Sequence, residues 1–256
     1  MCGRYVSPGQ AAIESIWHVG RRNQPALGQT EPVIPFPARY NVAPQQGKQA
    51  NYIPVLRQAP EGELELARLQ WWLLPFWSKE PRIKFSTFNA RVETVANAAS
   101  FREPFKRRRC IVPALGWYEW QELPSGNLPW FLHAATGELL AFAALWDHWE
   151  ARDGSGQVIE SCSLVVGPAN AVFMPIHDRM PFVLDEEQQA LWLDRSLNDP
   201  REVMEVLRPN RDDAIAFHRV GPRVSNARNQ GPELMAPLAE ADAPDSEGSG
   251  TPVPGN

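Results

Sequence analysis

The chain lacks the sequence features of membrane, secreted and zinc-binding proteins. No apolar run approaches the roughly 18 residues that cross a bilayer, and the first ten residues contain no apolar segment of the secretory type. Only three cysteines occur among 256 residues, and no CxxC or HxxxH pair suggests zinc. We therefore expect an intracellular protein with reduced thiols and no metal or membrane partner.

The composition is that of a globular protein. An apolar fraction of 43% and a charged fraction of 21% exclude a wholly disordered, collagenous or coiled-coil chain. The length is close to the limit for a single hydrophobic core. Residues 239–256, AEADAPDSEGSGTPVPGN, offer almost nothing to bury. We predict one domain over residues 1–238 and a disordered, acidic tail rich in Pro, Gly and Ser over residues 239–256.

The net charge of −5 comes from one end of the chain. Residues 233–256 carry five acidic side chains and no Lys or Arg, so the remainder is neutral. Within that remainder, residues 79–109 hold nine basic and three acidic side chains. This local excess is enough for a surface that contacts phosphates. A solvated helix face with basic residues near its C-terminal end is the alternative.

Short apolar runs separated by Gly, Pro and Ser predict an α+β protein dominated by antiparallel strands. Strands are expected at residues 52–57, 64–74, 110–120, 130–134, 139–146, 159–166, 182–184 and 214–220. Helical patterns occupy residues 94–100, 185–193, where Asp185 is the expected cap, and 201–207. Ser7, Pro8 and Gln10 predict the start of another helix, which ends at Gly20. The proline-rich residues 23–37 should be irregular.

Cys2 is a chemically unusual position. Removal of Met1 would leave an amine and a thiol on adjacent carbons, a pair that no internal cysteine offers. The amine, with an ordinary pKa near 8, can form a Schiff base with an aldehyde. The thiol can then close a five-membered thiazolidine. The alternative is that a cysteine at position 2 has no chemical role.

Three other segments contain residues suited to catalysis or binding. Glu119 lies among aromatic residues in GWYEW, where burial would raise its pKa and make it a proton donor, unless strand alternation turns it to solvent. His177 lies between two prolines and suits proton transfer near pH 7, or is an ordinary loop histidine. Asn89 and Arg91, two apart, would share a strand face and orient a sugar or phosphate; alternatively Asn89 is a turn residue.

Taken together, the motifs resemble those of a known family. In order, the chain carries CGRY at 2–5, RYNVAP at 39–44, Trp71 and LPFW at 71–77, FNARVET at 88–94, RCIVPA at 109–114, GWYEW at 116–120, IHDRMP at 176–181, and a closing segment at 224–238. This series resembles the SRAP proteins, the SOS-response-associated peptidases. Trp72 and Phe76 depart from the pattern, because many members have glycine and a small residue there.

The resemblance implies a protein of the DNA damage response that binds single-stranded DNA containing abasic sites. It implies a barrel-like, mainly antiparallel β core with peripheral helices, a cytoplasmic or nucleoid-associated monomer, and no cofactor. Its catalytic residues would be Cys2, which forms a thiazolidine crosslink with the sugar aldehyde, Asn89, Glu119 and His177. Its DNA-binding residues would be Arg4, Asn41, Pro44, Trp77, Arg91, Arg102 and Arg179.

Two other functions remain open. A thiol peptidase would use the same Cys2, Glu119 and His177 on a peptide, and it would have no use for a basic surface. A non-enzymatic single-strand binder would need the basic residues and the aromatics but not Cys2. The family name itself points to autocatalytic removal of Met1, and AP-lyase activity is a further expectation.

Overall fold

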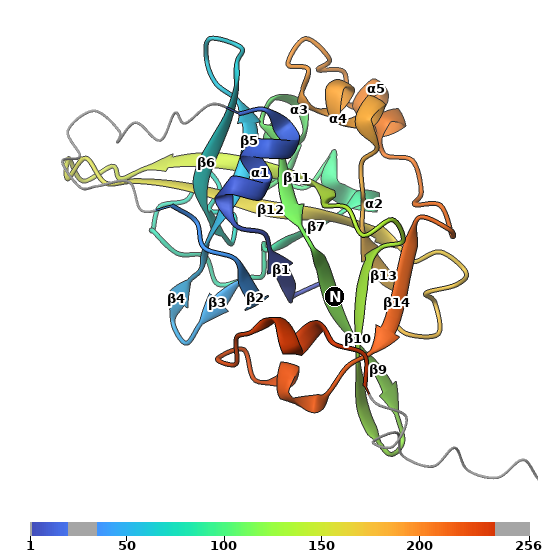
Figure 1. Cartoon of the computed structure of the whole chain (residues 1–256). Coiled ribbons are helices and arrows are strands. Elements are labelled where there is room, and N and C mark those ends of the chain that lie inside the picture. Colours follow the sequence, from blue (N-terminus) through green and yellow to red (C-terminus); the bar gives the residue numbers. More distant parts are fainter. Residues whose placement is uncertain (1, 20–34, 239–256) are drawn as a thin grey trace, which may run out of the picture.

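A computed structural model describes residues 2–19 and 35–238 of the chain. Five strands close into a barrel (Figure 1). Their order around the barrel is β11 (Leu140–Glu150), β8 (Arg109–Ala114), β5 (Tyr52–Gln58), β6 (Leu64–Trp71) and β12 (Val158–Pro168), which pairs again with β11. All of these pairings are antiparallel except that of β6 with β12. Closure pairs the edges that an open sheet would expose.

Two of the barrel strands, β8 and β11, are buried on both faces over most of their length, which explains their nearly continuous apolar sequences. In β8, Cys110 and Val112 belong to one core cluster, and Ile111, which points the opposite way, belongs to another. The first cluster is shared with the second sheet, and the second cluster is shared with the helices. The barrel therefore lies between these two layers.

The second sheet is entirely antiparallel. Its order is β14 (Ile215–Arg219), β10 (Gly126–Ala134), β9 (Gly116–Leu123), β1 (Tyr5–Ser7) and β2 (Arg39–Val42). A Cβ atom on Gly116 would lie 2.3 Å from the carbonyl oxygen of Leu132. Only glycine therefore permits the close approach of β9 and β10 there.

Two short strands and one small hairpin complete the β structure. On opposite edges of β12, β7 (Asn89–Arg91) pairs in parallel and β13 (Arg179–Pro181) pairs antiparallel. The hairpin of β3 (Gln45–Gln46) and β4 (Gln49–Ala50) was not predicted from the sequence.

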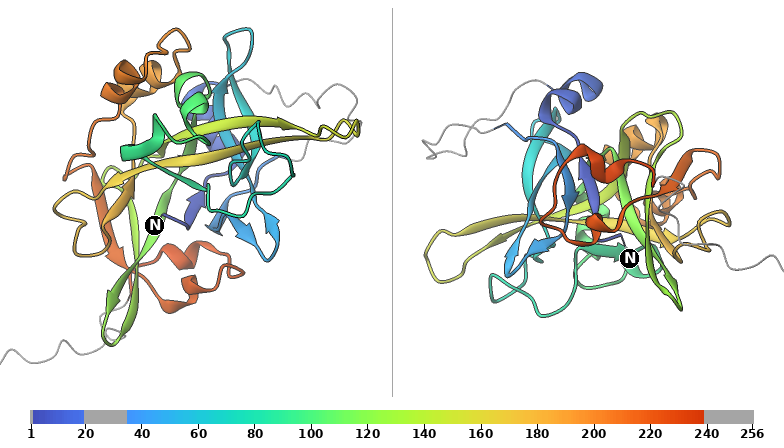
Figure 2. Two further views of the ribbon diagram at one scale, coloured as in Figure 1. Left: turned by 180° about the vertical axis from the view of Figure 1, so that it is seen from behind. Right: turned by 60° about the horizontal axis from the view of Figure 1, so that its bottom comes forward.

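The helices are short and peripheral. They are α1 (Gln10–Trp17), α2 (Val92–Val95), α3 (Arg102–Arg107), α4 (Glu186–Leu193), α5 (Pro200–Val206) and the 3-10 helices η1 (Pro222–Ser225) and η2 (Pro232–Met235). Figure 2 shows α3, α4 and α5 gathered at one end of the barrel and η1 and η2 beside the second sheet. The predicted fold class, an α+β protein with a mainly antiparallel, barrel-like core, is confirmed.

Several predicted boundaries are wrong. The expected strand at residues 110–120 is two strands, and that at 64–74 ends at Trp71. Residues 182–184 form no strand, because Phe182 donates its backbone hydrogen bond to Val165 of β12 whereas Leu184 donates to Ala141 of β11. The segment thus crosses from one strand to the other instead of pairing along either.

The helix predictions need smaller corrections. Asp185 caps α4 as predicted, in a capping box with Gln188. Ser7 is not the cap of α1, because it lies in β1 and Gly9 takes the cap position. The helix expected at residues 94–100 is the single turn of α2, at 92–95. Most of the proline-rich segment predicted to be irregular, and the whole predicted tail at 239–256, lie outside the described residues.

Candidate active site

The structure brings together the four side chains that the sequence marked as catalytic. Cys2 precedes β1, Asn89 begins β7, Glu119 lies in β9, and His177 lies in the loop before β13. Asn89 donates a hydrogen bond from Nδ2 to the carbonyl oxygen of Cys2 at 3.2 Å. Glu119 lies close enough to the Cys2 thiol to raise its pKa, and Glu119 Oε2 lies 3.9 Å from His177 Nε2. The two sheets thus contribute to one continuous set of polar contacts.

Glu119 is buried rather than turned to solvent. Strand alternation places it on the same face of β9 as Trp117, which packs in the core cluster containing Cys2. The opposite face of β9 is also covered, because Tyr118 packs with Val224 near η1. Only 3% of Glu119 is exposed. Burial raises the pKa of the Glu119 carboxyl, and His177 opposes part of this rise.

The Cys2 thiol is held in its protonated form. Burial raises the pKa of the thiol well above its ordinary value, and the negative charge of Glu119 raises it further. The Cys2 thiol must therefore lose its proton before its sulfur can act as a nucleophile. A neighbouring base must accept the thiol proton, and Glu119, which lies close enough to act on the pKa of the thiol, is placed to do so.

His177 is the most solvent-accessible end of this contact chain. Its Nδ1 accepts a hydrogen bond of 3.0 Å from the Arg179 backbone N–H, so the proton of the neutral ring is on Nε2, facing Glu119. Asp178 Oδ1 lies 3.1 Å from the same Nδ1. The His177 side chain is 23% exposed, whereas that of Glu119 is 4% exposed, so a proton can pass from solvent through His177 to Glu119.

Two of the predicted DNA-binding arginines flank this site. Arg91 ends β7, two residues from Asn89, and is exposed. Arg179 begins β13 and forms an ion pair with Glu93. Both strands pair with β12, where Arg91 lies opposite Val166 and Arg179 opposite Pro168. The two guanidinium groups therefore come from the two strands that border β12, beside the catalytic side chains.

Arg4 and Asn41 are engaged inside the protein. Arg4 donates hydrogen bonds to Asn41 Oδ1 at 2.9 Å and to the carbonyl oxygen of Val224 at 3.0 Å, and its guanidinium lies 5.4 Å from the centre of the Trp120 ring. Asn41 donates to the carbonyl oxygens of Val224 and Asn226, each at 3.0 Å. These contacts join η1 to β1 and β2. Their predicted contact with DNA stays a prediction.

The other predicted DNA-binding residues are Pro44, Trp77 and Arg102. Pro44 is buried before β3, and Arg102 is exposed at the start of α3. Trp77 is 37% exposed, and its Nε1 donates a hydrogen bond of 3.0 Å to the carbonyl oxygen of Ala99. The ring of Trp77 is thus fixed at one edge while part of its surface stays accessible.

The loop that carries Trp77 is held by side chains that sequence reasoning missed. Leu74 N donates to Ser161 Oγ at 2.8 Å, and Phe76 N donates to Asp147 Oδ2 at 3.0 Å. Trp149 Nε1 donates to the carbonyl oxygen of Ser78 at 2.8 Å. All three holding side chains come from β11 and β12. The one sequence feature that could have indicated this role is Asp147, a charged residue within an apolar strand.

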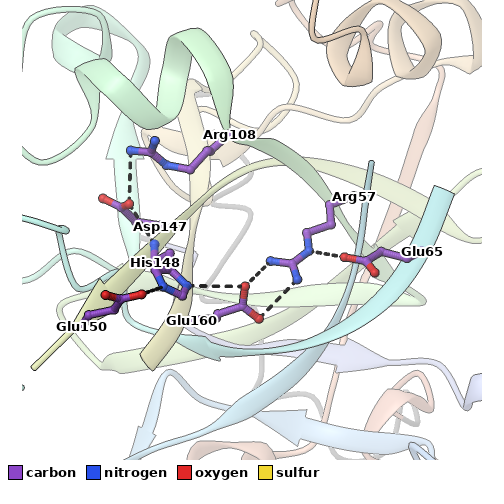
Figure 3. A network of polar contacts seen from close by, with 7 residues as sticks. All are labelled: Arg57, Glu65, Arg108, Asp147, His148, Glu150 and Glu160. Carbon is purple, nitrogen blue, oxygen red and sulfur yellow. Dashed lines mark hydrogen bonds and ion pairs between the residues drawn. The ribbon is translucent and has the colours of Figure 1, made fainter. Parts of the chain in front are cut away.

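Asp147 is part of a wider polar network. Its Oδ1 lies 3.1 Å from Arg108 Nη2, and the network continues through His148 to Glu160 and Arg57 (Figure 3). Burial raises the pKa of the Asp147 carboxyl, and Arg108 and the backbone N–H of Phe76 oppose that rise. A buried carboxylate with these partners fixes the loop more firmly than a surface contact would.

The basic stretch is less exposed than its sequence suggests. Arg109 is only 5% exposed, and its guanidinium donates to backbone carbonyl oxygens, including those of Trp192 and Asp194. Burial lowers the pKa of Arg109 to about 10. Arg108 is paired with Asp147. These two of the nine cations hold the fold together, so the excess of positive charge available to a ligand is smaller than six.

The described part of the chain contains neither a metal-binding cluster nor a membrane-spanning helix. No three His, Cys, Asp or Glu side chains within residues 2–19 and 35–238 gather closely enough to bind a metal ion. In the same ranges, no helix has both the length and the apolar character needed to cross a bilayer. Cys2, Cys110 and Cys162 are all buried and unpaired by disulfides.

Comparisons with known proteins agree with the geometry. The family model described as SOS response associated peptidase (SRAP) matches residues 1–227. Abasic site processing protein YoqW of Bacillus subtilis (strain 168) is 33% identical over 197 residues, which cover 77% of this chain and 84% of YoqW. Abasic site processing protein HMCES of Gallus gallus is 32% identical over 273 residues, covering 93% and 78%. A solved protein structure from Bacteroides thetaiotaomicron shares the fold, with a TM-score of 0.78 at 21% identity, over 93% of this chain and all of that one.

Proposed function

Because the chain belongs to the SOS response associated peptidase (SRAP) family, we propose that it processes abasic sites in DNA by forming a covalent crosslink through Cys2. The protein acts on single-stranded DNA as a monomer, after Met1 has been removed. The observation that carries this proposal is the hydrogen bond from Asn89 to the backbone of Cys2, the only residue that can become an aminothiol. Glu119, which raises the pKa of the Cys2 thiol, supports it.

The proposed reaction has two bond-forming steps. The free amine of Cys2 attacks the aldehyde of the ring-opened abasic sugar, and loss of water gives a Schiff base. The sulfur of Cys2 then adds to the carbon of that C=N bond, and the thiol proton ends on nitrogen, which completes the thiazolidine ring. No oxidant or metal takes part in either step.

The proton movements fall to Glu119 and His177. Glu119 gives a proton to the oxygen that leaves as water and recovers one from nitrogen as the Schiff base forms. It then accepts the thiol proton and delivers it to nitrogen as the ring closes, a cycle that suits a carboxyl whose pKa is raised by burial. His177, partly exposed, exchanges protons between Glu119 and solvent. Asn89 holds the Cys2 backbone so that the amine meets the aldehyde.

Single-stranded DNA fits the residues around the site. Arg91 and Arg179 border β12 and can contact phosphates, which carry no sequence information. Trp77 can stack on an unpaired base, a contact that an intact duplex does not offer. We propose that these residues align the strand while the abasic sugar enters between Asn89 and His177.

Autocatalytic removal of Met1 is a further part of this proposal. Glu119 lies close enough to Cys2 to act on the pKa of its thiol, so the same groups are placed to cleave the Met1–Cys2 peptide bond with water. Variants Glu119→Gln and Cys2→Ser, purified from the same host as the parent chain, should then retain Met1 in their intact mass. Complete removal of Met1 from both variants would assign the step to a host aminopeptidase.

AP-lyase activity follows from the Schiff base. The imine acidifies the neighbouring sugar carbon, and loss of a proton there expels the 3′ phosphate by β-elimination. We propose that this cleavage competes with thiazolidine formation. In this and every later test, Met1 is removed from each variant by an added methionine aminopeptidase. Strand cleavage should then increase in Cys2→Ser, which keeps the amine and lacks the sulfur that closes the ring.

The direct test mixes the protein with an abasic single strand and resolves the products under denaturing conditions. A heat-stable band that joins protein and DNA is expected with abasic DNA and not with an intact strand of the same sequence. His177→Ala should form the band more slowly without losing affinity for an unreactive abasic analogue. Turnover of peptides without any DNA adduct would favour the thiol-peptidase alternative.

A further inference from the structure

A large cavity lies apart from the catalytic side chains. It has a volume of about 750 Å³ and is walled by the β3–β4 hairpin, the ends of β5 and β6, residues 81–83 and the start of β12. Its size is within the range of about 300–1,000 Å³ that is usual for ligand sites. None of the four catalytic side chains lines it.

The chemistry of the cavity wall favours an anionic ligand with aromatic rings. Two cations, Lys48 and Arg82, and two aromatic residues, Tyr52 and Trp72, line it together with four glutamines at positions 45, 49, 70 and 157. Among the described residues of this wall, none is Asp or Glu. Lys48 and Arg82 are exposed and make no ion pair with any other described residue. Their charge is therefore available to a ligand.

The cavity is joined to the active site through packed rings. The Trp72 ring lies 5.4 Å from that of Phe88, and Phe88 directly precedes Asn89. The loop between β6 and β7 carries both Trp77 and the wall residue Arg82.

We propose that this cavity is a binding site for nucleotides of the same single strand, several positions away from the abasic sugar that reacts at Cys2. This inference rests on the proposed function. Lys48 and Arg82 bind phosphates, Trp72 stacks on a base, and the amides of the other three glutamines contact base edges, because the Tyr52 ring already faces Arg68 and the Gln70 amide donates to the Trp72 carbonyl oxygen. The site explains the bulky Trp72, which departs from the glycine common at this position in the family.

The test measures affinity against strand length on one side at a time. Oligonucleotides carry an unreactive abasic analogue and are extended by single nucleotides in either the 5′ or the 3′ direction. Stacking of one base contributes a factor of about 5–150 in affinity. We expect a gain of at least about 5-fold when the extension on one side reaches the cavity, and no such step on the other side.

The matched variants are Lys48→Ala/Arg82→Ala and Arg201→Ala/Arg211→Ala, which remove the same charge inside and outside the cavity. Lys48→Ala/Arg82→Ala should lose the increase in affinity with strand length. It should also reduce the slope of log affinity against log salt concentration by about 1.4, since each single-strand phosphate contact adds about 0.7. Arg201→Ala/Arg211→Ala should keep the parental increase and the parental slope. Neither should change the crosslinking rate on a short, saturating abasic strand.

Several outcomes would overturn the proposal. An affinity that rises evenly on both sides, or an identical step in both double variants, would exclude a strand site in the cavity. Binding of free dTMP that Lys48→Ala/Arg82→Ala abolishes, without any step in the length series, would assign the cavity to a mononucleotide instead. Because these measurements use an unreactive analogue, they stand even if no crosslink forms, whereas the proposed function would then fail.

Discussion

The side chain of Asn89 is hydrogen-bonded to the backbone of Cys2, with 3.2 Å between Asn89 Nδ2 and the Cys2 carbonyl oxygen. Asn89 is fixed in its turn, because β7 pairs with β12 at Leu164. Cys2 is thereby attached to the barrel, although the strand that follows it, β1, belongs to the second sheet. This contact between the layers helps to position Cys2.

Replacing Asn89 should therefore slow the chemistry more than the binding. In Asn89→Ala the Cys2 backbone is no longer held, and a displacement of about 1 Å can reduce a rate about 100-fold. Single-turnover crosslinking should fall by up to that factor, with unchanged affinity for an unreactive abasic analogue. Asn127→Ala, in the exposed β9–β10 hairpin, is the control. A parental rate in Asn89→Ala would remove its positioning role.

Glu119→Gln should make the protein slower and more stable at neutral pH. Burial raises the pKa of Glu119, so its contribution to stability is fully present below about pH 4.3 and is lost as the pH rises through the folded-state value. A glutamine does not ionise and so causes no such loss of stability. The free energy of unfolding of Glu119→Gln, relative to that of the parent chain, should therefore increase as the pH rises from about 4.3 through the folded-state pKa of Glu119. Crosslinking should fall about 10²–10⁴-fold.

Urea denaturation between pH 4 and 8 measures the stability of Glu119→Gln relative to the parent chain, and single-turnover crosslinking measures its reaction rate. An advantage that does not change with pH would show that Glu119 is not destabilised by burial. A parental crosslinking rate would show that Glu119 is not the proton carrier, whatever the stability data show.

Asp147→Asn should destabilise the protein and loosen the loop that carries Trp77. The carboxylate accepts hydrogen bonds from the backbone N–H groups of Phe76 and His148 and pairs with Arg108. An amide oxygen cannot replace all of these contacts, and an unsatisfied buried donor costs about 1–3 kcal/mol. Denaturant unfolding should show a loss of that size, and the affinity for single-stranded DNA should fall with it.

Glu150→Gln is the control for Asp147→Asn. It removes a carboxylate from the same strand, but its side chain is 70% exposed, so the change in stability should stay within about 0.5 kcal/mol. Equal effects of the two substitutions would contradict the special position of Asp147.

Arg91→Ala should weaken binding to all DNA sequences alike. Arg91 is exposed and lies two residues from Asn89 on β7. Titrations over a range of salt concentrations should show a slope reduced by about 0.7, with the same loss for strands of different sequence. A loss confined to one sequence would indicate a base contact instead of a phosphate contact.

Much of the fold follows from local sequence. The capping pair of Asp185 and Gln188 predicts the start of α4, and continuous apolar runs predict β8, β11 and β12. The failures lie where tertiary contacts decide. Residues 182–184 have the composition of a strand, but their hydrogen bonds go to two different barrel strands. A pattern of residue types contains no information on that choice.

The site was less predictable from local pattern. Alternation alone left the side of Glu119 open, because it does not reveal that β9 is covered on both faces. The basic stretch gave no sign that Arg108 and Arg109 are internal, since a buried and an exposed arginine look the same in sequence. The grouping of Cys2, Asn89, Glu119 and His177 came from the family resemblance, because their separation in sequence hides their contact.

The intact mass of the adduct tests the central claim most directly. The parent chain, incubated with an abasic single strand and denatured by heat, should retain a species with the mass of the chain lacking Met1 plus the DNA minus one water. Cys2→Ser should give such a species only after reduction of its imine, and Cys2→Ala should leave no heat-stable adduct. Undiminished heat-stable crosslinking by Cys2→Ala, or an adduct mapped to a residue other than Cys2, would contradict the account.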